Sequence, residues 1–79
     1  MVIDAQSWKK VADESGVFQN QSQEYLSVRQ SIAEPTDTDG LLIKPGASIV
    51  FDAGGSGGRD LWAYNKDRAT ALYFFETDS

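Results

Sequence analysis

Residues 44–51 read Lys44-Pro45-Gly46-Ala47-Ser48-Ile49-Val50-Phe51, a turn followed at once by a strand. Proline fixes φ at the first central position of a type II turn, and glycine accepts the positive φ that the second position requires. After the turn, Ile49 and Phe51 fall on one side of an extended chain, and Ser48 and Val50 fall on the other. This stretch predicts β structure with tight turns.

The segments on both sides of this stretch continue the same pattern of short strands and turns. Within residues 25–31, Leu26 and Val28 alternate with Ser27 and Arg29, as in a half-buried strand. Further strands are expected at residues 17–19, 41–43, 61–64 and 69–76, and the runs 17–19 and 25–31 are expected to pair as a hairpin. With turn signals every 8–12 residues or so, the sequence predicts an all-β fold. We expect a small antiparallel β-sandwich or barrel of five to seven short strands, without an internal repeat.

The first fifteen residues allow more than one interpretation, whereas residues 16–79 are expected to form a single β-domain. Trp8, Val11 and Ala12 have spacings that would line one face of a short helix, but Ser15-Gly16 would end it early. Residues 7–11 also fit a short strand, which we favour slightly. The sequence therefore predicts an N-terminal arm, a helical turn or a first strand over residues 1–15.

The last expected strand, residues 69–76, is apolar on both faces. Such a strand lies at the centre of a sheet, or buries one face in the core and the other against a partner. Aromatic side chains are enriched at the energetic centres of protein interfaces. The residues predicted for a subunit contact are Trp62, Tyr64, Tyr73 and Phe75.

Residues 53–58 read Ala53-Gly54-Gly55-Ser56-Gly57-Gly58. Glycine loses more backbone freedom on ordering than any other residue, so this stretch predicts a mobile hairpin tip. The glycines of the predicted tip are Gly54, Gly55, Gly57 and Gly58. This tip and residues 1–6 are the segments that we expect to become ordered on a partner.

The composition argues against catalysis and against several kinds of partner. The 79 residues include neither cysteine nor histidine, which removes thiolate and imidazole from catalysis and from metal binding. We therefore expect no catalytic residues, no cofactor and no metal. The net charge of −5 argues against nucleic acid or an anionic membrane as partner. The N-terminus has neither the basic segment nor the apolar segment of a signal peptide.

Four short motifs follow one another between Phe18 and Glu76. They are Asn20-Gln21-Ser22, Leu42-Ile43-Lys44-Pro45-Gly46, Leu61-Trp62-Ala63 and Ala71-Leu72-Tyr73-Phe74. Further matching residues are Phe18, Tyr25-Leu26-Ser27-Val28, Pro35, Asp39-Gly40-Leu41, Ala47-Ser48 and Phe51. In this order they resemble a class of small virion proteins of tailed bacteriophages, over about three-quarters of the chain. The resemblance implies an all-β module of the capsid surface, neck or tail fibre, usually a homo-oligomer without catalytic residues.

We therefore expect a non-enzymatic virion component, a decoration or accessory protein made in the host cytoplasm. It would form a homo-oligomer, a trimer or larger, and dock on other virion proteins. The first alternative is a module that binds carbohydrate or a host surface, in which Trp8, Trp62 and Tyr64 stack on a glycan. The second alternative is a small acidic phage protein that regulates or inhibits a host protein.

Overall fold

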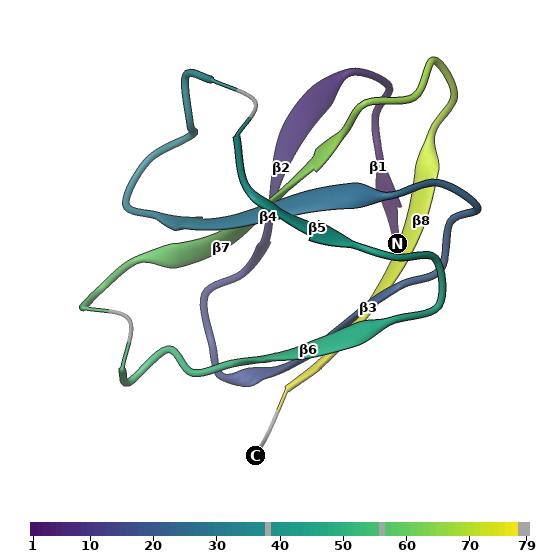
Figure 1. Cartoon of the computed structure of the whole chain (residues 1–79). Helices are drawn as coiled ribbons and strands as arrows, with labels where there is room; N and C mark the ends of the chain where they lie inside the picture. The colour runs from purple at the N-terminus through teal and green to yellow at the C-terminus, as the bar shows by residue number, and fades with distance from the viewer. Residues whose placement is uncertain (38, 56, 78–79) are drawn as a thin grey trace.

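Eight β-strands and no helix make up the described part of the chain, residues 1–37, 39–55 and 57–77 of a computed structural model. The strands are β1 (Val2–Ile3), β2 (Ser7–Ala12), β3 (Gly16–Asn20), β4 (Leu26–Ser31), β5 (Leu41–Ile43), β6 (Ser48–Phe51), β7 (Asp60–Asn65) and β8 (Ala71–Thr77). They form two antiparallel sheets, ordered β1-β8-β3-β6 and β2-β7-β4-β5 (Figure 1).

The predicted all-β sandwich is confirmed, and the helix considered for residues 7–14 is replaced by β2. The strand beyond the expected seven is β1, which is too short to show a periodic pattern.

The antiparallel pairs are nested within one another along the chain. β4 pairs with β5, β3 with β6, β2 with β7 and β1 with β8. The chain is thus one long hairpin wrapped onto itself, and the pairs β3–β8 and β4–β7 complete the two sheets. This is the strand order of an eight-stranded jelly roll, a double-sheet form of the β-sandwich.

Two predicted hairpins are wrong, because strands that follow one another here lie in opposite sheets. β3 belongs to the first sheet and β4 to the second, so the runs 17–19 and 25–31 do not pair. The glycine-rich segment likewise connects β6 in one sheet with β7 in the other, so it is a crossover rather than a hairpin tip. Both connections are longer than the two-residue loops that force neighbouring strands to pair.

The glycine-rich crossover begins with a turn that its own aspartate holds. Asp52 Oδ1 accepts hydrogen bonds from the N–H groups of Gly54 and Gly55, at 3.0 and 3.2 Å. Gly57 and Gly58 have φ of 71° and 85°, a conformation that residues with a side chain rarely adopt. The four glycines predicted as a mobile tip thus lie in turns of a crossover, and their mobility stays a prediction; Ser56 lies outside the described residues.

The inner faces of the two sheets supply one apolar core. The largest buried apolar side chains are those of Phe18, Phe51, Ile3, Leu26 and Leu61. Phe18 stacks on Tyr73, with ring centroids 5.7 Å apart and an interplanar angle of 23°. Phe75 points to the same side and packs against the core next to Gly16, where a Cβ atom would lie 2.7 Å from Phe75 Cζ. Gly16 thus leaves the space that the ring of Phe75 needs.

Because Tyr73 is buried, the stability of the fold changes with pH in the alkaline range. Desolvation raises the pKa of Tyr73 above its ordinary value of 10.0. Once the pH passes about 10, the unfolded chain therefore loses this proton more readily than the folded chain, and the stability falls as the pH rises. We expect the urea midpoint to drop between about pH 9 and pH 11, and to drop less in Tyr73→Phe. Equal drops in both proteins would show that other groups cause the dependence.

A buried asparagine, Asn20, closes the connection between β3 and β4. Its Nδ2 donates to Glu24 O at 2.8 Å and to Ile43 O at 2.9 Å. Its Oδ1 accepts from the backbone N–H of Ser22 at 2.9 Å. The amide therefore joins the connecting turn to the end of β5.

Asn65 has the same role between β7 and β8. It is fully buried, and its Nδ2 donates to Ala69 O at 2.7 Å and to Ile3 O at 3.2 Å. Its Oδ1 accepts from Asp67 N at 2.9 Å. This amide therefore joins its turn to the end of β1.

These two asparagines belong to a repeat of topology, although the sequence predicts no internal repeat. If β1–β4 are matched with β5–β8, the order β1-β8-β3-β6 becomes β5-β4-β7-β2, which is the other sheet. Asn20 and Asn65 then occupy equivalent places, as do Gln6 with φ 52° and Gly46 with φ 80°. Few residues carry this correspondence, which is why no repeat is visible in the sequence.

Candidate interaction surface

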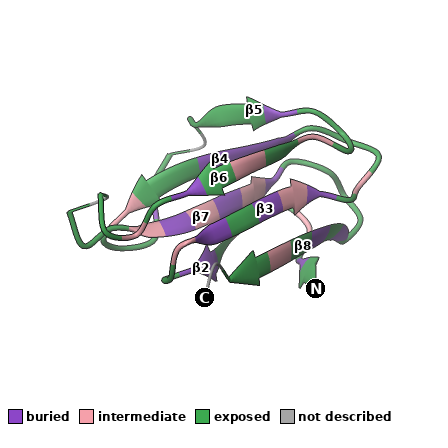
Figure 2. Ribbon diagram, turned by 90° about the horizontal axis from the view of Figure 1, so that it is seen from below, coloured by how far each residue is buried: buried purple, intermediate pink, exposed green. Residues whose placement is uncertain are grey.

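The outer face of the β1-β8-β3-β6 sheet carries five exposed apolar side chains. They alternate along their strands with core residues, as Figure 2 shows for β3 and β8. The five are Val2, Val17, Val50, Leu72 and Phe74, with exposed fractions of 43, 41, 79, 50 and 41%. We call these five residues the apolar face.

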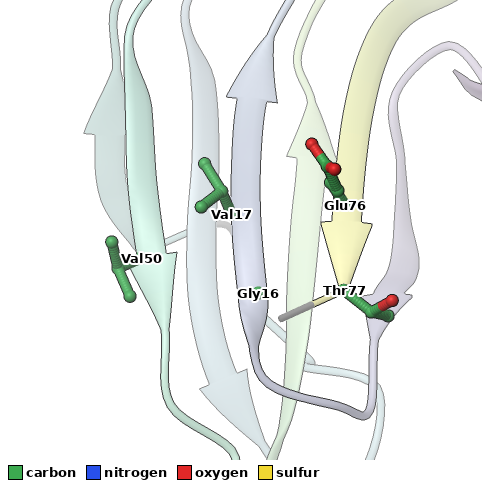
Figure 3. A pocket seen from close by; sticks show the side chains of 5 residues that line it. All are labelled: Gly16, Val17, Val50, Glu76 and Thr77. Atoms are coloured by element: carbon green, nitrogen blue, oxygen red, sulfur yellow. The ribbon is translucent and has the colours of Figure 1, made fainter. Parts of the chain in front are cut away.

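Strand pairing places Val2, Leu72 and Phe74 at one end of the apolar face and Val17 and Val50 at the other, with Phe74 and Val17 as diagonal neighbours between them. Val2 pairs with Leu72, and Val17 lies between Val50 and Glu76 on the neighbouring strands (Figure 3). A shallow hollow of about 330 Å³ lies at this end of the sheet, lined by Gly16, Val17, Val50, Glu76 and Thr77. Exposed apolar side chains grouped in this way mark interaction sites in soluble proteins.

The apolar face also carries little charge. The other strand residues that point outward there are Gln19, Ser48 and Glu76, so a single carboxylate lies among eight side chains on this face. The whole chain, by contrast, has 12 acidic and 7 basic residues among 79. Depletion of charge is what distinguishes the centre of a protein interface from ordinary surface.

The outer face of the β2-β7-β4-β5 sheet has a different character, because both indole N–H groups on it are bonded to carbonyls of the chain itself. Trp8 and Tyr64 contact each other, with ring centroids 5.2 Å apart and an interplanar angle of 49°. Trp8 Nε1 donates to Asp37 O at 2.8 Å, and Trp62 Nε1 donates to Ser31 O at 3.2 Å. All three rings are half-buried.

Residues 32–37 of the loop after β4 fold back onto this second face. Arg29 forms an ion pair with Asp37, and Pro35 is buried although it lies between exposed residues. A further ion pair joins Lys10 Nζ to Asp60 Oδ2 at 4.0 Å. This face is therefore charged and partly covered by the chain itself, unlike the apolar face.

The structure separates the four residues predicted for a subunit contact. Trp62 and Tyr64 point outward from β7, where they are half-buried beside the loop after β4. Tyr73 is only 4% exposed and Phe75 packs on the core, so neither lies on an outer face. The prediction placed the wrong side of β8 outward, because a one-residue shift moves every side chain of a strand to the opposite face. The outward apolar residues of β8 are Leu72 and Phe74, which were not among the predicted contact residues.

Other kinds of site find no support in residues 1–37, 39–55 and 57–77. No group of three or more acidic side chains there is placed to hold a metal ion. The same ranges contain no helix suited to crossing a membrane. Comparison of the chain with models of protein families, with curated proteins and with solved structures finds no match.

Proposed function

We propose that this chain is a structural assembly protein that associates with copies of itself through the apolar face. The observation that carries the proposal is the apolar face, whose five apolar side chains are 41–79% exposed and whose eight outward strand side chains include a single carboxylate. Jelly rolls are common in viral capsid proteins and in lectins, which agrees with a virion component by analogy of fold only. The chain would then be a decoration or accessory protein, made in the host cytoplasm and docked on other virion proteins.

The side of the molecule that carries the apolar face is large enough for a contact with a second copy. The Cα atoms of the molecule extend over 33 × 25 × 17 Å, and the sheets lie along the broad side. A broad side of this size offers roughly 800 Å², which is what one partner buries in a contact of standard size. A small domain without disulfides gains stability when it buries such a surface in an oligomer.

The charge of the chain predicts how the association depends on salt. Two copies of net charge −5 repel each other, but the apolar face brings together only Glu76 from each copy. Salt screens the long-range repulsion and leaves the apolar contact intact. The proposed association is therefore stronger at high ionic strength than at low.

The glycan alternative has less support than self-association. A sugar ring needs the open face of an aromatic ring together with polar partners around it. Here both indole N–H groups donate to carbonyls of the chain itself, and residues 32–37 lie against the same sheet. We therefore assign Trp8 to holding the loop at Asp37 and Trp62 to bonding the end of β4.

Replacing Leu72 and Phe74 by serine is expected to weaken the association at least tenfold, about 1.4 kcal/mol or more. Both side chains leave water when the proposed contact forms, and neither lies in the core. The measurement is sedimentation equilibrium over a range of protein concentrations. The matched control is Leu42→Ser, because Leu42 is 53% exposed on the other sheet.

Two outcomes would count against the proposed function. One is a parent protein that sediments as an 8.7 kDa monomer at every concentration and salt level. The other is a loss of association in Leu42→Ser equal to that in the double variant of Leu72→Ser and Phe74→Ser. Thermal denaturation of each variant separates weaker association from loss of fold.

A further inference from the structure

We infer that β6 forms a second contact between copies, in which its outer edge pairs antiparallel with the same strand of another copy. The two-fold axis of this pair passes at Ile49, the residue between Ser48 and Val50. The inference rests on the proposed function, since it takes the partner to be a second copy of this chain. It adds a hydrogen-bonded edge contact that the apolar face alone does not provide.

A comparison of the four edge strands singles out β6. Natural edge strands avoid pairing with other chains through lysines, prolines, bulges or shortness. β2 carries Lys9 and Lys10 and has an irregular register between Lys10 and Ala12, while β1 has two residues and β5 three. β6, Ser48–Phe51, has none of these protections except modest length. It is the longest edge strand without charge, proline or bulge.

The backbone of β6 has hydrogen-bonding groups that its own sheet does not use. Among the described strands, β6 pairs with β3 alone. The N–H of Asn20 donates to Ala47 O at 3.0 Å, which fixes the residues that face β3. Successive residues of a strand turn their backbone N–H and C=O groups to opposite edges. The backbone groups of Ile49 therefore point toward β3, and those of Ser48 and Val50 point toward the free edge of β6. Two N–H and two C=O groups are thus presented at the edge.

These four groups are complementary to the same four groups of a second copy. With the two-fold axis at Ile49, Ser48 of one copy lies opposite Val50 of the other. Each such pair exchanges two hydrogen bonds, so four bonds satisfy all the outward groups of both edges. A foreign strand must supply a matching pattern, whereas a second copy has it by symmetry.

Apolar surface on the same side of the sandwich gains cover from this pairing. A groove of about 480 Å³ opens between β5 and β6, with Val28 and Leu61 among its buried lining residues. Leu41 and Val50 at its rim are 63 and 79% exposed. Edge pairing places the rim of one copy next to the same rim of the other copy. It also joins the apolar faces of the two copies into one surface. The edge contact is therefore continuous with the proposed face contact.

The variant that tests the edge contact is Ser48→Pro. Proline removes the outward N–H of residue 48 and leaves every bond between β6 and β3 in place, which is why edge strands tolerate it. Ser48→Thr is the matched control, because it keeps the N–H and is suited to a strand. A two-fold contact closes at two copies, so two different contacts give an assembly larger than a dimer. We expect Ser48→Pro to lower the mass of the assembly in sedimentation to that of the copies joined by the apolar face alone, and Ser48→Thr to keep the mass of the parent.

Amide hydrogen exchange in the parent protein provides a readout that needs no variant. In dilute monomer the amides of Ser48 and Val50 exchange quickly, while that of Ile49 is protected by β3. In the assembly we expect the protection of Ser48 and Val50 to rise at least tenfold. An assembling parent with unchanged exchange at these two amides, or with unchanged mass in a folded Ser48→Pro, overturns the edge contact alone. A parent that stays monomeric overturns the proposed function itself.

Discussion

Asn65→Ala is expected to lower the free energy of unfolding by about 3–5 kcal/mol, most of the stability that a chain of this size has. The side chain is fully buried and satisfies carbonyl groups of two different segments, Ile3 and Ala69, and the N–H of Asp67. Each buried polar group that is left without a hydrogen-bond partner lowers the free energy of unfolding by about 1–3 kcal/mol. Urea denaturation followed by tryptophan fluorescence measures the loss.

The corresponding variant Asn20→Ala is expected to be destabilised to a similar degree, because its amide also bonds two carbonyls, Glu24 O in its own turn and Ile43 O in the other sheet. Gln21→Ala is the control, since Gln21 is exposed and its side-chain amide donates only to Gln19. We expect the control to stay within about 0.5 kcal/mol of the parent. A loss below about 1 kcal/mol in both asparagine variants would mean that water replaces the missing amides.

Phe18→Ala is expected to lower the stability by about 3–5 kcal/mol through the cavity that it leaves. Phe18 is fully buried at the centre of β3 and stacks on Tyr73. Since small domains have only about 0.05–0.15 kcal/mol of stability per residue, much of this protein would be unfolded at room temperature. Circular dichroism during thermal denaturation measures the change.

Phe74→Ala is the matched control for Phe18→Ala, because it removes the same ring from the opposite side of the sheet. Phe74 is 41% exposed, so the change is expected to have little effect on the stability of the monomer. It should weaken self-association instead. Equal destabilisation of the two variants in dilute solution would contradict the assignment of inner and outer faces.

The local structure could be predicted from the sequence because local chemistry determines it. The turn at Pro45-Gly46 is confirmed, with φ of 80° at Gly46 and a hydrogen bond from Ala47 N to Lys44 O at 3.0 Å. Alternation in residues 25–31 correctly places Leu26 and Val28 in the core. These features depend on neighbours within a few residues.

The pairing of strands could not be predicted, because it depends on residues far apart in the chain. Nothing between residues 20 and 26 indicates that β3 bonds to β6 and β8 rather than to β4. The orientation of β8 had the same difficulty, since both of its faces are apolar. The clue was Gly16, whose missing side chain leaves space for Phe75 on the inner side. That clue can be used only once β3 and β8 are known to be neighbours.

The nested pairing of the strands determines the order in which the protein can fold during synthesis. The innermost pair, β4–β5, is joined by loop 32–40 and needs the shortest closure, whereas β1 pairs only with the last strand. A nascent chain therefore cannot complete the β1-β8-β3-β6 sheet until its C-terminal residues have been made. Folding through such distant contacts takes milliseconds to seconds in all-β domains. Until β8 is in place, β1 and one edge of β3 lack the strand that pairs with them, and growing chains on one messenger are exposed to one another.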